Sequence, residues 1–277
     1  MATESRNPRS YGLDKMNARE IVRLMDEEEH VVYKVMQSAQ AQIAEAIEHV
    51  ADCYRKGGRI FYVGSGTSGR IATADAAEMP PTFGIEPDRF IAVVSGGTSA
   101  NDKAVEDAED DGTASIQILN LMGVGPKDVV IGLAASGTTA FVLSAIRHAK
   151  AKGSWTCGIS NNKKTPLLEE ADLGILLDTG PEVLTGSTRL KAGTSQKLAL
   201  NRISTGAMVL NGKVIENLMI DVKAKNIKLR ERCVRIVCEL SNATADEARS
   251  QLELCDYNIR TAIEELRKEQ PSSAFSG

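Results

Sequence analysis

The sequence predicts an α/β protein with a five-stranded parallel sheet sandwiched by helices and a small C-terminal three-helix bundle. Two observations lead to this prediction. Five short apolar runs recur along the chain, separated by segments long enough to form helices, and the last fifty residues carry three short helical patterns. Strands that are apolar throughout and joined by helical crossovers are typical of parallel sheets covered on both faces.

The five predicted strands are rich in β-branched and aromatic residues. They cover residues 59–63, 90–94, 129–133, 155–159 and 173–177. The pair Gly57-Gly58 ends the helical pattern before the first of them. In sheets of this kind ligands bind beyond the carboxyl ends of the strands, so we expect the ligand-binding residues in the loops that follow the strands.

Apolar residues at helical spacing predict the remaining elements. Two amphipathic helices are expected between residues 17 and 54, a long helix over 196–210, and three short helices over 227–240, 244–254 and 257–266. We therefore predict an N-terminal helical segment over residues 1–56, an α/β domain over 57–220 and a small helical domain over 221–270.

Composition excludes several function classes. The 277 residues carry a net charge of -4, which gives no global attraction for nucleic acid. A basic run from Lys223 to Arg235 is most simply a solvated helix face. The N-terminus lacks the apolar core of a secretory signal, and no stretch is long and apolar enough to span a membrane. We expect a cytoplasmic protein with no nucleic-acid or membrane partner.

The five cysteines show none of the close paired spacings of zinc sites, so we expect reduced thiols and no metal. The histidines fall in helical segments, away from the loops. No His-Asp-Ser arrangement follows from motif spacing, and packing or surface roles are expected for these histidines.

A glycine-rich loop follows the first predicted strand, from Gly64 to Arg70. At a strand-to-helix turn the free N–H groups of the helix favour an anion, so Gly66, Thr67 and Ser68 are candidates for holding a phosphate. A tight turn would use the same residues. The loop lacks both the Gly-Lys-Ser/Thr ending of a P-loop and the spacing of a dinucleotide-binding turn.

A second hydroxyl-rich loop follows the third strand, with Ser136, Gly137 and Thr139 as candidates. Together the two loops suit a sugar carrying a single phosphate. A third stretch, from Thr185 to Gly193, places Ser187 and Lys191 before a helix. It fits either an anion site or an ordinary polar loop.

Two acids lie near these loops in the sequence. Glu78 precedes Pro80 and Pro81, which end the preceding helical pattern, and Glu109 lies in an acidic run. From the residues alone, solvated helix ends explain both glutamates.

Several stretches, taken together, resemble the sugar isomerase (SIS) superfamily and, within it, the N-acetylmuramic acid 6-phosphate etherases over nearly the whole chain. They are Thr3-Glu-Ser-Arg-Asn-Pro, residues 61–70, Pro80-Pro-Thr-Phe-Gly, residues 180–194 and Asn217-Leu-Met-Ile-Asp-Val.

The resemblance implies the SIS fold, a homodimer with its active site at the subunit interface, and a lyase that needs neither metal nor redox cofactor. It implies that Glu78 and Glu109 are the catalytic pair, with Glu78 acting on the ether, and that the enzyme serves N-acetylmuramate catabolism in cell-wall recycling.

Two positions depart from the family pattern: Thr98 stands where a histidine is usual, and Thr138 where an arginine is usual. Two alternatives stay open. One is a non-catalytic sugar-phosphate sensor similar to the glucokinase regulatory protein, and the other is an aldose-ketose phosphate isomerase.

Overall fold

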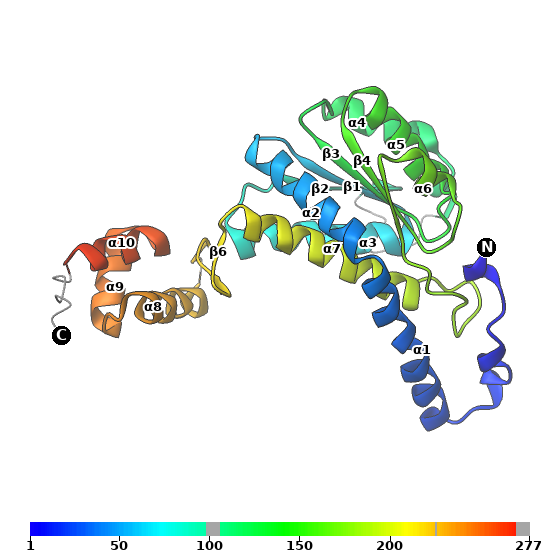
Figure 1. Ribbon diagram of the computed structural model, residues 1–277, viewed down its shortest axis with the longest axis horizontal. Coiled ribbons are helices and arrows are strands. Elements are labelled where there is room, and N and C mark those ends of the chain that lie inside the picture. Colours follow the sequence, from blue (N-terminus) through cyan, green and yellow to red (C-terminus); the bar gives the residue numbers. More distant parts are fainter. Residues whose placement is uncertain (98–105, 225, 270–277) are drawn as a thin grey trace. The chain divides into compact units, whose positions relative to one another are not determined.

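The computed structural model describes residues 1–97, 106–224 and 226–269. It divides into two compact units (Figure 1). The first comprises Met1–Ala77 and Pro87–Ala207, and the second comprises Glu78–Glu86 and Met208–Gly277. The predicted domain limits, 1–56, 57–220 and 221–270, stay a prediction.

The first unit contains a five-stranded sheet in the order β2-β1-β3-β4-β5. Its strands are β1 (Ile60–Gly64), β2 (Phe90–Val94), β3 (Val129–Leu133), β4 (Trp155–Ser160) and β5 (Leu173–Leu176). All four pairings are parallel. Because β1 and β3 are buried along their whole length, both faces of the sheet are covered, and the predicted α/β fold is confirmed.

Helices pack on both faces of the sheet (Figure 1). The α-helices described between the N-terminus and residue 210 are α1 (Ala18–Ser38), which extends away from the sheet, α2 (Gln40–Arg55), α3 (Gly66–Phe83), α4 (Gly112–Leu121), α5 (Ala140–Ala151), α6 (Pro166–Glu170) and α7 (Lys191–Leu210). Helix α5 packs on β1, β3 and β4, whereas α2 packs on β1, β3 and β5. Phe61, Val130 and Phe141 belong to the apolar core between the sheet and α5.

Local sequence fixes the start of α1. Asn17 and Glu20 form a reciprocal capping box at the start of α1. Short 3-10 turns, η1 (Ala2–Glu4), η2 (Pro8–Ser10) and η3 (Leu13–Lys15), precede it. A further turn, η5 (Glu106–Glu109), lies before α4.

Between residue 211 and residue 269, the described part of the second unit contains an antiparallel pair, β6 (Val214–Ile215) and β7 (Leu218–Met219), followed by three helices. These are α8 (Ile227–Ser241), α9 (Ala245–Leu254) and α10 (Ile259–Glu269). Each helix contacts the other two, around a core that includes Cys233, Val237 and Leu252. The expected helical C-terminal region is therefore present.

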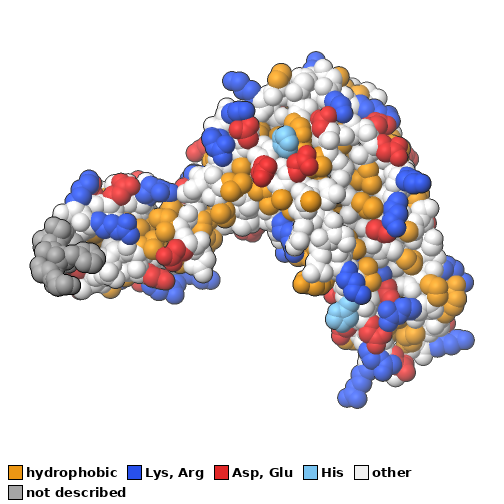
Figure 2. Space-filling model, in the orientation of Figure 1, with side chains coloured by type: hydrophobic (Ala, Val, Ile, Leu, Met, Phe, Trp, Pro, Cys, Tyr) orange, Lys and Arg blue, Asp and Glu red, His pale blue; other side chains and the backbone are white. Residues whose placement is uncertain are grey.

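Charged side chains of both signs are interspersed on the face that Figure 2 displays. Among the residues described, no helix is long and apolar enough to cross a bilayer.

Candidate active site

The two hydroxyl-rich loops leave neighbouring strands at the same level. Strands β1 and β3 pair in parallel, and their register places Gly64 opposite Leu133 at the carboxyl edge of the sheet. The loop after β1 and the loop after β3 therefore begin side by side. This is the edge at which parallel sheets bind ligands.

The first loop uses glycine where the chain turns into α3. Gly66 has φ +53° and is exposed, with open space where a side chain would lie. Thr67 is half-buried, and its methyl group packs so close to Gly193 that a Cβ added to this glycine would lie only 3.3 Å from it. Ser68 is buried, and its hydroxyl donates a 2.8 Å hydrogen bond to Gln196 Oε1 on α7. Of these candidates, Gly66 is the most open to a ligand.

The second loop holds two hydroxyls close together. Ser136 Oγ lies 3.4 Å from Thr139 Oγ1 and accepts a 3.2 Å hydrogen bond from the backbone N–H of Thr138. Thr139 precedes the first residue of α5, and its side chain does not cap that helix. Ser136 and Thr139 thus lie half-buried at a helix N-terminus, where an anion is favoured.

Gly137 is required by the geometry of the second loop. Its φ is +70°, and a Cβ there would come within 2.4 Å of Thr165 Oγ1. The loop therefore passes too close to the turn before α6 for any side chain at position 137.

A buried chain of amides joins the first loop to β4. Gln196 Nε2 donates to Asn161 Oδ1 (3.0 Å), and Asn161 Nδ2 donates to Ser195 Oγ (2.9 Å). Asn161 also donates to the carbonyl of Leu177. Sequence reasoning missed these residues. The signal for Asn161 was its position directly after an apolar strand.

In the third loop, between β5 and α7, a buried carboxylate bonds to the backbone at the start of α7. The carboxylate of Glu182 accepts the backbone N–H groups of Lys191 (3.1 Å) and Ala192 (2.9 Å), so it caps α7. Burial raises the pKa of Glu182 against these two hydrogen bonds, which lower it. Ser187, the other candidate in this loop, is half-buried in the turn between Leu184 and Leu190.

The side chain of Lys191 is itself buried. Its ammonium group pairs with Glu28 on α1 and donates to the carbonyl of Pro181 (2.8 Å). Burial acts to raise the pKa of Glu28, but hydrogen bonds from Lys191 and Asn7 and nearby positive charge outweigh it and hold that pKa below its usual value. The Lys191 ammonium group therefore holds α7 against α1.

The first residues of the chain hold two of the loops. Thr3 is fully buried: its hydroxyl accepts from Asn162 Nδ2 (2.9 Å), and its carbonyl accepts from the N–H of Gly186 (3.3 Å). Asn7 donates to Glu28 (2.7 Å). The motif that begins at Thr3 therefore packs against the loops after β4 and β5.

A buried carboxylate on α3 ties this helix to the sheet. Asp75 accepts hydrogen bonds from Asn201 (2.6 Å), Tyr62 (3.1 Å) and Ser204 (3.2 Å). Burial raises the pKa of Asp75 despite these donors.

The two candidate acids are exposed. Glu78 lies on α3 in the second unit, and α3 continues through Pro80 and Pro81 to Phe83, so the expectation that these prolines end the helix is wrong. Glu109 ends the η5 turn in the first unit. Thr98, one of the two departures from the family pattern, lies outside the described residues. Thr138, the other departure, is exposed in the second loop.

Comparison with known proteins places this architecture in a family. Residues 25–161 match the model of the SIS domain. An N-acetylmuramic acid 6-phosphate etherase of Geobacillus thermodenitrificans is 48% identical over 264 residues, which cover 95% of this chain and 89% of the relative. The chain belongs to the N-acetylmuramic acid 6-phosphate etherase family. A member of this family from Pectobacterium atrosepticum is 45% identical over 263 residues, 95% of this chain and 87% of its own.

Solved structures agree with the SIS fold of the family. A phosphoheptose isomerase from Francisella tularensis matches with a TM-score of 0.55 and 16% identity, over 70% of this chain and all of its own length. A protein of E. coli CFT073, solved in complex with a ligand, matches with a TM-score of 0.53 and 21% identity, over 73% of this chain and 97% of its own. At these identities the likeness is one of fold, and the resemblance found in the sequence is confirmed by the curated relatives.

Proposed function

We propose that this protein is a carbon-oxygen lyase that cleaves the D-lactyl ether of N-acetylmuramic acid 6-phosphate. The products are N-acetylglucosamine 6-phosphate and D-lactate. The observation that carries the proposal is identity of 48% to an etherase across 95% of the chain, a span that includes the loops described above.

The loops at the carboxyl edge of the sheet are the proposed binding site for the sugar phosphate. Gly66 and Thr67 on one side, with Ser136 and Thr139 on the other, offer hydroxyls and helix N-termini to a phosphate. The isomerase from Francisella tularensis, which shares the fold, is named for a phosphorylated heptose, and this supports a sugar phosphate as the ligand class.

For Ser68 and Lys191, which the sequence predicts to bind the substrate, we propose an indirect contribution within this site. Ser68 bonds to Gln196, and Lys191 pairs with Glu28, so each fixes the position of a loop. Gly137 and Ser187 are proposed to contribute backbone and hydroxyl contacts to the ligand.

Glu78 and Glu109 are proposed to perform the proton transfers. In the open-chain sugar the aldehyde acidifies the C2 proton, so one carboxylate removes it while a carboxylic acid protonates the ether oxygen at C3. The C3–O bond breaks, D-lactate leaves and a C2–C3 double bond forms. Water then adds at C3 and a proton returns to C2, which gives the product sugar.

Each general acid or base of this kind typically accelerates a step by about 10²–10⁴-fold. For both protonation states to coexist near neutral pH, the two glutamates must lie in different surroundings. We assign Glu78 to the ether oxygen and Glu109 to C2 or to the incoming water.

The biological setting follows from the substrate. N-acetylmuramic acid is an amino sugar of the cell wall, so we propose that the enzyme acts in cell-wall recycling in the cytoplasm, as a homodimer whose interface completes the active site. No metal or redox cofactor has a step in this reaction, and no nucleic-acid or membrane partner is required.

Release of D-lactate tests the proposed function. Purified protein is incubated with N-acetylmuramic acid 6-phosphate, and D-lactate and sugar products are measured. The expected result is one D-lactate for each N-acetylglucosamine 6-phosphate formed. A rearranged sugar without lactate would identify an isomerase, and binding without any product would identify a sensor.

Variants at the two glutamates test their roles. Glu78→Gln is expected to abolish lactate release while sugar-phosphate binding persists, and Glu109→Gln is expected to behave in the same way. Exposed Glu48 on α2 provides the control, because Glu48→Gln is expected to retain full activity. Full activity of Glu78→Gln would remove this residue from the mechanism.

A further inference from the structure

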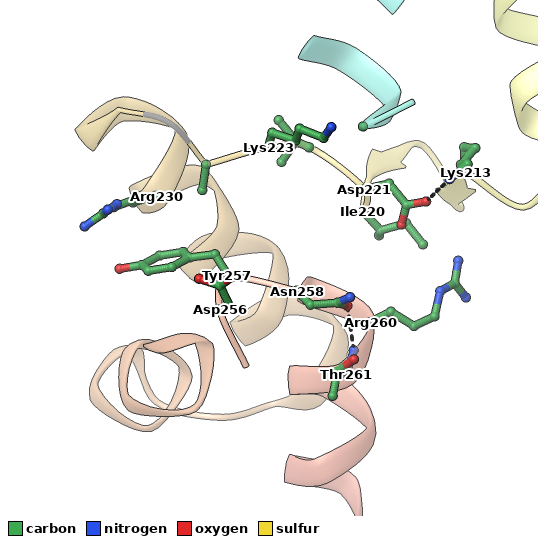
Figure 3. A pocket seen from close by; sticks show the side chains of 13 residues that line it. Lys213, Ile220, Asp221, Lys223, Arg230, Asp256, Tyr257, Asn258, Arg260 and Thr261 are labelled. Carbon is green, nitrogen blue, oxygen red and sulfur yellow. Dashed lines mark hydrogen bonds and ion pairs between the residues drawn. The ribbon is translucent and has the colours of Figure 1, made fainter. Parts of the chain in front are cut away.

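The second unit contains a cavity of about 660 Å³ (Figure 3). Its walls come from the segment after β7, the start of α8 and the turn between α9 and α10, with Gly84 at one side. All of its lining residues belong to the second unit. The proposed reaction uses none of them. The volume is within the range of small-molecule sites, about 300–1,000 Å³.

Positive charge exceeds negative charge around this cavity. The lining includes four cationic side chains and two carboxylates: Lys213, Lys223, Arg230, Arg260, Asp221 and Asp256. Four positive and two negative charges leave a surplus of two. The Lys213 ammonium neutralises Asp221 at 2.8 Å, and that of Lys223 lies 3.9 Å from Glu86, so among the described residues the positive charge without a carboxylate partner rests with Arg230 and Arg260.

The two guanidinium groups are held by contacts other than carboxylates. Arg260 donates to the carbonyl of Gly212 (2.7 Å), and Arg230 lies 4.9 Å from the centre of the Tyr257 ring. In the part of the chain that the structure describes, neither has an acidic side chain within ion-pair distance. Guanidinium groups match the oxygens of a phosphate in geometry and charge, and the fork of donors allows paired hydrogen bonds.

The turn between α9 and α10 directs polar groups to the same cavity. Asp256 and Tyr257 have φ of 50° and 58°, two consecutive left-handed residues that are not glycine. Asn258 follows and accepts the N–H of Thr261, so α10 begins at the cavity with the positive end of its dipole. Figure 3 displays Asn258 and Thr261 between Tyr257 on one side and Arg260 on the other.

We propose that this cavity binds a small metabolite that carries a phosphate monoester. Arg260 and the start of α10 bind the phosphate, and the Tyr257 ring with Arg230 contacts the body of the molecule. A ligand of this class neutralises the surplus positive charge and fits the volume of the cavity. The basic run from Lys223 to Arg235 thereby gains a function, because two of its members line the cavity.

Residue-specific titration of the full-length protein tests this proposal. Inorganic phosphate and glucose 6-phosphate are added separately to isotope-labelled protein, and backbone amide shifts are followed by NMR. We expect saturable shifts at residues 257–261 with both ligands, and none with glucose. Shifts in the loops of the first unit report the proposed catalytic site and are fitted separately.

A matched pair of variants on α10 isolates the contribution of Arg260. Arg267 is on the same helix and donates to the carbonyl of Leu240 (2.8 Å), as Arg260 does to Gly212, but it does not line the cavity. Arg260→Gln is expected to weaken phosphate binding at residues 257–261 at least tenfold, and Arg267→Gln to leave it unchanged. Arg260→Lys, which keeps the charge, is expected to bind with intermediate affinity.

Three outcomes would overturn the proposal. The first is the absence of saturable shifts at residues 257–261, and the second is equal weakening by Arg260→Gln and Arg267→Gln. The third is a tenfold rise in KM for lactate release by Arg260→Gln without added phosphate, because the cavity would then belong to the substrate site. Failure of the proposed lyase activity alone leaves the titration result intact, so the two proposals fail separately.

Discussion

Ser68 and Gln196 lie 128 residues apart, yet the hydroxyl of Ser68 donates a 2.8 Å hydrogen bond to the side-chain oxygen of Gln196. Both side chains are buried, and Gln196 in turn donates to Asn161 after β4. One amide thus connects the loop after β1, the loop after β4 and helix α7. The buried Ser68 side chain therefore fixes the position of the glycine-rich loop, whereas Gly66 is exposed and Thr67 is half-buried.

Replacement of Gln196 by Met keeps the length of the side chain and removes both hydrogen bonds. Ser68 and Asn161 would then each bury a polar group without this partner, at about 1–3 kcal/mol apiece. We expect a loss of about 2–6 kcal/mol in the free energy of unfolding, measured in urea, and a higher KM for lactate release. Thr194→Ala, at an exposed position on the same helix, is the control. An unchanged stability of Gln196→Met would show that the amide chain does not hold the loop.

A second prediction concerns how the buried pair of Lys191 and Glu28 contributes to stability. Lys191→Met leaves the Glu28 carboxylate buried without its main counter-charge, which typically costs about 3–5 kcal/mol. The double variant Glu28→Gln/Lys191→Met is expected to lose less stability than the sum of the two single losses, because neither member of the pair is left as an unpaired buried charge. Additive losses in urea unfolding would mean that the two side chains are not coupled.

The Glu28 carboxylate of this pair is expected to make the free energy of unfolding depend on pH in the acidic range. The pKa of Glu28 is lower in the folded protein than its ordinary value of 4.5, so its contribution is complete above pH 4.5 and is lost as the pH falls through the lowered value. We expect the free energy of unfolding to decline below about pH 4.5 less steeply in Glu28→Gln than in the wild type. If the free energy of unfolding had the same pH dependence in the two proteins, Glu28 would not be the group responsible for the decline.

Gly137 provides a test of the second loop. Gly137→Ala combines a φ of +70° with a Cβ only 2.4 Å from Thr165 Oγ1, whereas Gly123→Ala has a similar φ of +62° and open space around the new methyl group. The left-handed backbone conformation alone costs an alanine about 1–2 kcal/mol in either variant. We expect Gly137→Ala to lose more stability than Gly123→Ala in thermal unfolding and to raise KM for lactate release. Equal losses would mean that the loop moves freely away from Thr165.

The sheet was predictable because its signal is local. The runs 90–94 and 129–133 are apolar at every position and coincide with β2 and β3. The helix expected over 196–210 begins earlier, at Lys191, because the side chain of Glu182 caps it from outside the helical pattern. Periodicity contains no information about a cap supplied by a residue nine positions away.

The fine structure of the site depends on contacts between distant parts of the chain, which periodicity does not encode. Sequence reasoning placed Ser68 and Lys191 at a ligand because they lie in polar loops, but their side chains bond to Gln196 and Glu28. Both partners lie in helical patterns, where they look like ordinary surface residues. The catalytic roles of Glu78 and Glu109 rest on family resemblance and stay predictions.

The proposed mechanism cleaves the ether by elimination followed by addition of water, and the final position of the solvent oxygen is its sharpest test. The wild-type reaction is run in water enriched in ¹⁸O, and both products are analysed by mass spectrometry soon after mixing. We expect one ¹⁸O at the C3 hydroxyl of N-acetylglucosamine 6-phosphate, with the ether oxygen leaving in unlabelled D-lactate. Label in the lactate hydroxyl, with an unlabelled C3, would contradict it.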